Sequence, residues 1–109
     1  MRIEIEGIDN VTIKKRIRKM IKDGEVLTWK FVTEENHSRL MHTGDKQYED
    51  VVLKFLTKEG ENNVTIEPKV RNGVKDIEIA KDHFGVVMGR FAELLNCHFA
   101  DIKTYKTII

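Results

Sequence analysis

The chain has 109 residues, a common size for one domain, and 40% of them are hydrophobic while 34% are charged. This mixture is typical of a globular protein and excludes a low-complexity or disordered chain. The 19 lysines and arginines nearly balance the 18 aspartates and glutamates, so the overall charge does not favour a polyanionic partner. We expect a single domain over residues 1–109.

The cysteine content and the apolar segments limit where such a chain works. Cys97 is the only cysteine, which excludes an intramolecular disulfide and a multi-cysteine zinc site and is typical of a reducing compartment. Residues 2–6 alternate isoleucine with charged residues and lack the apolar run of a signal peptide. The most apolar segment, residues 84–99, is interrupted by Arg90 and Glu93 and is too short for a membrane span. We therefore expect a cytoplasmic protein with no membrane segment.

The first third of the chain predicts a strand, a helix and a second strand. Residues 2–6 have the period of two that a half-buried strand shows. Apolar residues then recur at helical spacing over about residues 10–23, and Gly24 is a suitable helix end. Residues 26–32 alternate again and carry bulky aromatic side chains, which predicts the second strand.

The middle of the chain predicts antiparallel pairing. Residues 34–36 are a plausible turn, and residues 38–43 are either a short returning strand or a loop. Residues 51–58 and 64–71 both alternate apolar and polar side chains and are joined by turn residues, which predicts a hairpin.

A second hairpin is predicted to follow directly. Asn72 and Gly73 favour the two positive φ angles of a type I′ turn, and residues 74–80 read as its second strand. Pro68 has no N–H to donate to a sheet, so we expect it at an edge or bulged position.

The last part of the chain predicts a core helix and a final strand. Apolar residues recur at helical spacing from Lys81 to Phe99, and Asp82 suits the positive end of that helix. Residues 102–109 are rich in threonine, tyrosine and isoleucine and predict a strand. Because strand-helix-strand units are right-handed, both helices should lie on the same face of the sheet. We predict an α+β two-layer sandwich: a mostly antiparallel sheet of five to six strands with two helices on one face, ferredoxin-like with an extra hairpin.

The first predicted helix is strongly basic. Six of the nine residues from Lys14 to Lys22 are positively charged, and such a helix face can bind phosphates without reading sequence. The alternative is a solvated helix face whose lysine and arginine stems cover apolar surface. The candidate partner-binding residues are Lys14, Lys15, Arg18, Lys19 and Lys22.

The second face of the predicted sheet mixes apolar residues with lysines. If the helices cover only the other face, these apolar residues form a surface for a second copy or a protein partner. Scattered exposed hydrophobic residues are also ordinary, and lysines keep an open sheet face soluble. This sheet-face patch consists of Val26, Thr28, Val32, Val52 and Leu56.

A third candidate is the segment around His42, read as part of a loop. There Arg39 can hold an anionic group while His42 moves a proton and Asp45 supplies a carboxylate. Such residue types also fall together by chance in a polar loop, and proximity in sequence is not catalytic geometry. The four histidines are scattered without metal-ligand spacing, so neither a metal site nor a cofactor is predicted.

These patterns rank three hypotheses of function. The leading one is a small non-enzymatic binding or adaptor domain that self-associates or binds a protein partner through its open sheet face. A nucleic-acid-binding module that uses the basic helix face is the first alternative. A small enzyme with a site at Arg39, His42 and Asp45 is the second.

Overall fold

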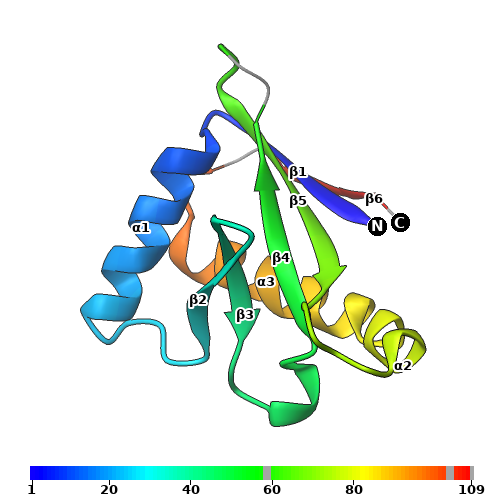
Figure 1. The fold of residues 1–109 in the computed structure, drawn as a ribbon. Coiled ribbons are helices and arrows are strands. Elements are labelled where there is room, and N and C mark those ends of the chain that lie inside the picture. Colours follow the sequence, from blue (N-terminus) through cyan, green and yellow to red (C-terminus); the bar gives the residue numbers. More distant parts are fainter. Residues whose placement is uncertain (58–59, 103–104, 109) are drawn as a thin grey trace.

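A computed structural model describes residues 1–57, 60–102 and 105–108 of the chain (Figure 1). Six strands, three α-helices and one 3₁₀ helix lie within these residues. In chain order they are β1 (Arg2–Glu6), α1 (Asn10–Lys22), β2 (Trp29–Glu34), β3 (His37–His42), η1 (Lys46–Tyr48), β4 (Val51–Leu56), β5 (Asn63–Val70), α2 (Ile77–Asp82), α3 (Phe84–His98) and β6 (Tyr105–Ile108).

The strands form one sheet in the order β2-β3-β4-β5-β1-β6, and every neighbouring pair is antiparallel. This confirms an α+β fold with an antiparallel sheet at the upper end of the predicted strand number. The ferredoxin-like assignment, with both helices on one face, stays a prediction. Residues 103, 104 and 109 of the predicted last strand lie outside the described residues, and β6 occupies the part between them. No helix among the described residues is long and apolar enough to cross a membrane.

Helix α1 begins and ends where its sequence predicts. The Asp9 side chain accepts a hydrogen bond of 2.8 Å from the backbone N–H of Thr12, as a helix N-cap does. Ile13 and Ile17 are buried one turn apart, so the helix turns one apolar stripe inward. Gly24 follows the helix with a φ of +78°, a conformation that glycine adopts without steric cost.

The hairpin of β2 and β3 resolves the ambiguity at residues 38–43 in favour of a strand. Glu35 and Asn36, at its turn, have φ angles of +52° and +66°, the two positive values that a type I′ turn requires. The second strand starts at Trp29 and not at residue 26, because residues 26–28 precede the pairing that begins between Trp29 and His42. β3 therefore carries His42 at its end.

The predicted strand over residues 74–80 is wrong. Gly73 has a φ of +88°, but Asn72 lacks the positive φ that a type I′ turn needs at both positions. The Asp76 side chain instead accepts a hydrogen bond of 3.1 Å from the backbone N–H of Ile79 and caps the short helix α2. The alternation of apolar and polar residues here does not mark a buried strand face, because Ile77 and Ile79 are both half exposed.

The predicted helix from Lys81 to Phe99 is divided at His83. Asp82 is the last residue of α2 and directly precedes His83, the N-cap of α3, so it stays close to the N-terminus of the core helix, as predicted. His83 is both the C-cap residue of α2 and the N-cap residue of α3. Its ring nitrogen Nδ1 lies 2.8 Å from the Asp50 carboxylate.

Pro68 lies within β5, which is an interior strand of the sheet as a whole. The pairing of β5 with β1 ends at Ile66, however, and Pro68 is paired only with Leu53 of β4. The missing N–H is tolerated because β1 does not extend far enough to pair with Pro68.

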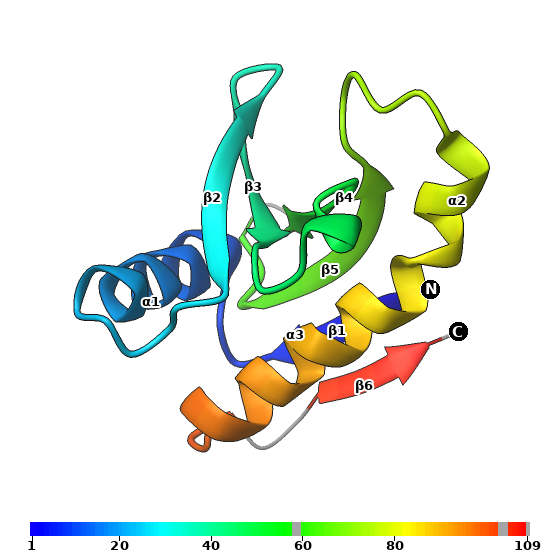
Figure 2. The ribbon, with the colours of Figure 1, turned by 90° about the horizontal axis from the view of Figure 1, so that it is seen from below.

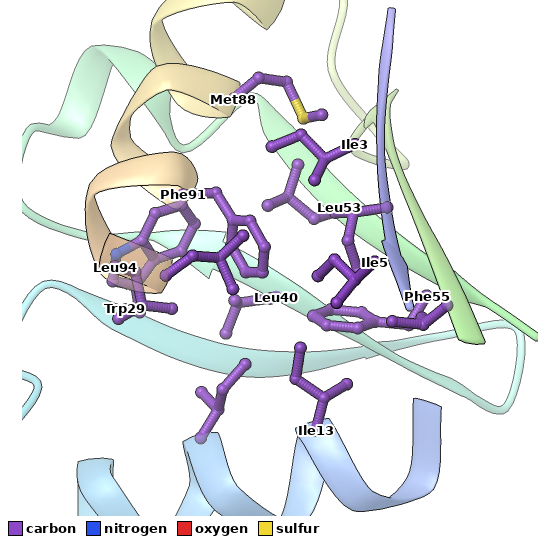
Figure 3. Close-up of a cluster of buried hydrophobic side chains, with 14 of the residues drawn as sticks. Ile3, Ile5, Ile13, Trp29, Leu40, Leu53, Phe55, Met88, Phe91 and Leu94 are labelled. Atoms are coloured by element: carbon purple, nitrogen blue, oxygen red, sulfur yellow. The ribbon is translucent and has the colours of Figure 1, made fainter. Parts of the chain in front are cut away.

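One buried cluster joins the sheet to both long helices (Figure 3). Ile13 of α1 and Phe91 of α3 point into the same group of side chains as Ile5 and Phe55 of the sheet. The rings of Phe55 and Phe91 meet edge-on with their centroids 6.0 Å apart. Each such fully buried side chain contributes about 1.5–3 kcal/mol through the hydrophobic effect, so this cluster is the main source of stability.

The sheet is strongly curved (Figure 2). A buried carboxylate lies on the face opposite the main core. Glu34 at the end of β2 is 8% exposed. It accepts hydrogen bonds from the backbone N–H of Asn72, at 2.8 Å, and from Lys69 Nζ, at 3.1 Å. This interaction, the Glu34 clasp, links the β2–β3 hairpin to the segment after β5. Met41 and Val52, neighbours on this face of β3 and β4, are buried.

Candidate functional site

Two adjoining hollows lie where β2 begins and β3 ends, against α3. They have volumes of about 320 and 380 Å³. Both are lined by the same four residues: Thr28, His42, Arg90 and Glu93. Because of these shared walls they are best regarded as one site with two parts, which we call the His42 site.

The β2–β3 hairpin and α3 position the side chains of this site. Trp29 and His42 are partners in the sheet register, and the backbone N–H of Thr43 donates a 2.7 Å hydrogen bond to the Thr28 carbonyl oxygen. The open end of the hairpin is thereby fixed. Arg90 and Glu93 stand one turn apart on α3, with Arg90 Nη1 and Glu93 Oε2 separated by 3.4 Å.

The two parts of the His42 site differ in polarity. The first part has an apolar wall that includes Val26, Leu27 and Leu94. Leu27, at the rim, is 81% exposed. The second part adds polar groups, among them Asp45 and Tyr48.

His42 is the central group of the site. It is 6% exposed, and its Nδ1 is buried without a hydrogen-bond partner among the described residues. Burial lowers its pKa, and the nearby Arg90 lowers it further, while Asp45 and Glu93 partly oppose the shift. The imidazole is therefore neutral at pH 7. Since a buried N–H without an acceptor is costly, the proton is favoured on Nε2, the other ring nitrogen.

Asp45 contributes a fixed negative charge. Its side chain accepts hydrogen bonds from the side-chain amide of Gln47, at 2.9 Å, and from the backbone N–H of Gln47, at 3.2 Å. These hydrogen bonds lower the pKa of Asp45, so the carboxylate is ionised at neutral pH. The site thus combines a neutral imidazole, an ionised carboxylate and the guanidinium of Arg90.

The structure brings together only part of the predicted Arg39, His42 and Asp45 group. His42 and Asp45 line one hollow, but Arg39 is three residues before His42 in β3 and so points to the opposite face of the sheet. The loop expected here is also wrong for Arg39 and His42, which lie in a strand. Arg90, from α3, is the guanidinium beside His42. Its only sequence signal is the polar interruption of residues 84–99.

A second histidine with a carboxylate partner lies next to the site. His83 Nδ1 is 2.8 Å from Asp50 Oδ2, and the Tyr48 ring meets the His83 ring edge-on with centroids 5.0 Å apart. Tyr48 also lines the polar part of the His42 site. Sequence reasoning missed this pair because His83 and Asp50 are 33 residues apart in the chain and meet only in the fold.

Most of the cations of α1 are engaged within the chain. Lys14 Nζ donates to the Ser38 carbonyl oxygen at 3.1 Å, and its pKa is lowered by burial and then by Arg18 and Arg39. Arg18 donates to Ser38 Oγ and lies over the Phe31 ring.

The remaining cations of α1 divide into two pairs. Lys19 is paired with Asp23 at 2.9 Å, and Arg16 holds Asp101 through two hydrogen bonds. Lys15 and Lys22 are exposed, and neither side chain makes a hydrogen bond or ion pair with the part of the chain that the structure describes. The basic face is therefore less free to bind a partner than its sequence indicates.

The residues of the sheet-face patch are not together on one exposed surface. Val26 belongs to the buried cluster, and Val52 is fully buried near the Glu34 clasp. Thr28 is exposed and lines the His42 site, Val32 is half-buried and Leu56 is exposed. The continuous apolar surface expected from these five residues is therefore not present.

No group of three histidine, cysteine, aspartate or glutamate side chains within residues 1–57, 60–102 and 105–108 is placed to hold a metal ion. Comparisons with protein-family models, with curated proteins and with solved structures found no match to this chain. The site must be interpreted from its own chemistry.

Proposed function

We propose that the chain is a small ligand-binding domain and that its ligand occupies the His42 site. The observation that carries this proposal is the position of His42: a buried, neutral imidazole in the wall shared by an apolar and a polar hollow. Binding sites for small molecules commonly combine an apolar wall with a few convergent polar groups. The proposal keeps the expected binding role and moves it from the sheet face to this hollow.

The other binding hypotheses have less support. Self-association through the sheet face loses Val26 and Val52, which are buried within the chain. Nucleic-acid binding by α1 has only Lys15 and Lys22 as cations without a partner among the described residues. A cytoplasmic location remains a prediction from the sequence.

The enzyme alternative is favoured by one specific observation. His42 and Asp45 line the same hollow, and Arg90 supplies the cation that was expected from Arg39. A neutral imidazole beside a carboxylate can accept or donate a proton. This alternative requires turnover of the bound ligand, whereas the binding proposal requires only reversible association.

Trp29 provides a direct test, because it is the only tryptophan and its ring lies against His42 in the wall of the site. We expect ligands from a small-molecule library to change the fluorescence of Trp29 saturably. Thr28→Phe, which fills the shared wall, should abolish the response. Thr33→Phe is the matched control, since Thr33 is an exposed threonine of β2 outside the site. A response that persists in Thr28→Phe would place the ligand elsewhere and refute the proposal.

A further inference from the structure

The His42 site carries an excess of negative charge. Its lining includes three carboxylates, Glu25, Asp45 and Glu93, but one guanidinium, that of Arg90. Arg90 is within 3.4 Å of Glu93 and offsets one of them. Lys19, which lies near enough to Glu25 to interact with it, is itself paired with Asp23 at 2.9 Å. The Asp45 carboxylate has only Gln47 as its hydrogen-bond partner among the described residues, and glutamine adds no charge.

The apolar part of the site favours a ligand with an apolar body. Leu27 is 81% exposed at its rim, beside the nearly buried Val26 and Leu94. Covering exposed apolar surface contributes roughly 25 cal/mol for each Å² removed from water. A ligand with an apolar body is therefore stabilised at this end of the site.

The two requirements apply to one molecule because the two parts share their walls. A ligand with its apolar body against Leu27 and Leu94 must pass His42 to reach Asp45. We infer that the ligand is a small amphipathic amine, with its apolar body against Leu27 and its positive charge near Asp45 and Glu93. This inference rests on the proposed function of the His42 site and names the class of its ligand.

Three probes of equal length separate charge from apolar contact: hexylamine, 1-hexanol and hexanoate, titrated into the full chain at neutral pH with Trp29 fluorescence as the signal. We expect hexylamine to bind at least about tenfold more tightly than either of the others, which corresponds to about 1.4 kcal/mol. Equal or tighter binding of hexanoate or hexanol would overturn the ligand class but leave the binding site in place. Absence of hexylamine binding up to about 10 mM would overturn the inference as well.

Variants of the carboxylates provide the second test. Asp45→Asn and Glu93→Gln should each weaken hexylamine binding by about two- to fivefold, as expected for partly exposed charges, and should leave hexanol binding unchanged. Glu67→Gln is the matched control, because Glu67 lies on the opposite face of the sheet. Hexylamine affinity unchanged in the Asp45→Asn and Glu93→Gln double variant would refute the assigned charge contact. The fluorescence of each unliganded variant checks that Trp29 keeps its environment.

Discussion

The indole ring of Trp29 meets the imidazole of His42 edge-on, with ring centroids 4.8 Å apart and an angle of 82° between the planes. The pair stands where β2 begins and β3 ends, and it connects the core to the candidate site. Trp29 also meets Phe91 of the core edge-on, at 6.0 Å. Protonation or displacement of His42 should therefore affect both the stability of the fold and the binding of a ligand.

The first prediction concerns pH. Because the pKa of His42 is lowered from 6.5 in the folded chain, the unfolded chain binds the proton more readily. The contribution of the neutral imidazole to stability is complete above pH 6.5 and is lost as the pH falls below that value. We expect the free energy of unfolding to fall more steeply below pH 6.5 in the wild type than in His42→Gln, measured by urea denaturation.

His37→Gln is the control for this titration, since His37 is exposed on the same strand. It should follow the wild-type pH dependence. Identical pH dependence in wild type and His42→Gln would contradict the lowered pKa of His42.

The second prediction compares two glycines. A Cβ on Gly44 would lie 2.9 Å from His42 Cε1 and 3.2 Å from Thr28, too close for either side chain to stay in place. Gly44→Ala should therefore displace His42, change the Trp29 emission and destabilise the fold by about 1–3 kcal/mol. A Cβ on Gly89 of α3 would meet no atom of another part of the fold within 4 Å, so Gly89→Ala should stabilise the fold by up to about 1 kcal/mol through helix propensity. Thermal unfolding followed by circular dichroism tests both, and an equal change in the two variants would contradict the close packing at Gly44.

The sequence correctly predicted the helices and strands that are defined by nearby residues, such as a helix cap, a turn or an apolar period. The Asp9 cap, the apolar stripe of α1 and the glycine after it suffice to define that helix. The alternation in β4 and β5 likewise defined their hairpin, since each strand has one face in the core. Local signals failed around α2, where Asp76 acts as a helix cap and Ile77 is exposed despite the strand-like alternation.

The candidate site was predictable only in part for the same reason. His42 and Asp45 are close in sequence, and both line the site. Arg90 and Glu93 come from α3. They could not be assigned to the site from the sequence, because no local pattern predicts which strand a helix packs against. Arg39 was misassigned because its direction depends on β3 being a strand, which the sequence left undecided between strand and loop.

The third prediction concerns the Glu34 clasp. Glu34→Ala leaves the backbone N–H of Asn72 and the ammonium of Lys69 without this acceptor, so we expect a loss of about 1–3 kcal/mol in the free energy of unfolding. Glu34→Gln keeps one acceptor oxygen and should lose less. Glu67→Ala is the control, because the Glu67 side chain makes no hydrogen bond or ion pair with the described residues. Urea denaturation measures all three, and an unchanged midpoint in Glu34→Ala would contradict a stabilising role for the clasp.

The last prediction separates the structural from the free cations of α1. Arg16 holds Asp101 through two hydrogen bonds and lies 4.3 Å from the centre of the Phe99 ring, so Arg16→Ala should destabilise the fold by about 1 kcal/mol. Lys15→Glu with Lys22→Glu should change stability by less than about 0.5 kcal/mol, because both side chains are exposed. Fluorescence anisotropy of labelled duplex DNA against salt then tests the surface itself, and we expect no saturable binding by the wild type at low salt. Binding that weakens linearly in log salt by about 0.9 per phosphate contact, with a slope reduced by nearly two contacts in the double variant, would instead make this helix a nucleic-acid surface.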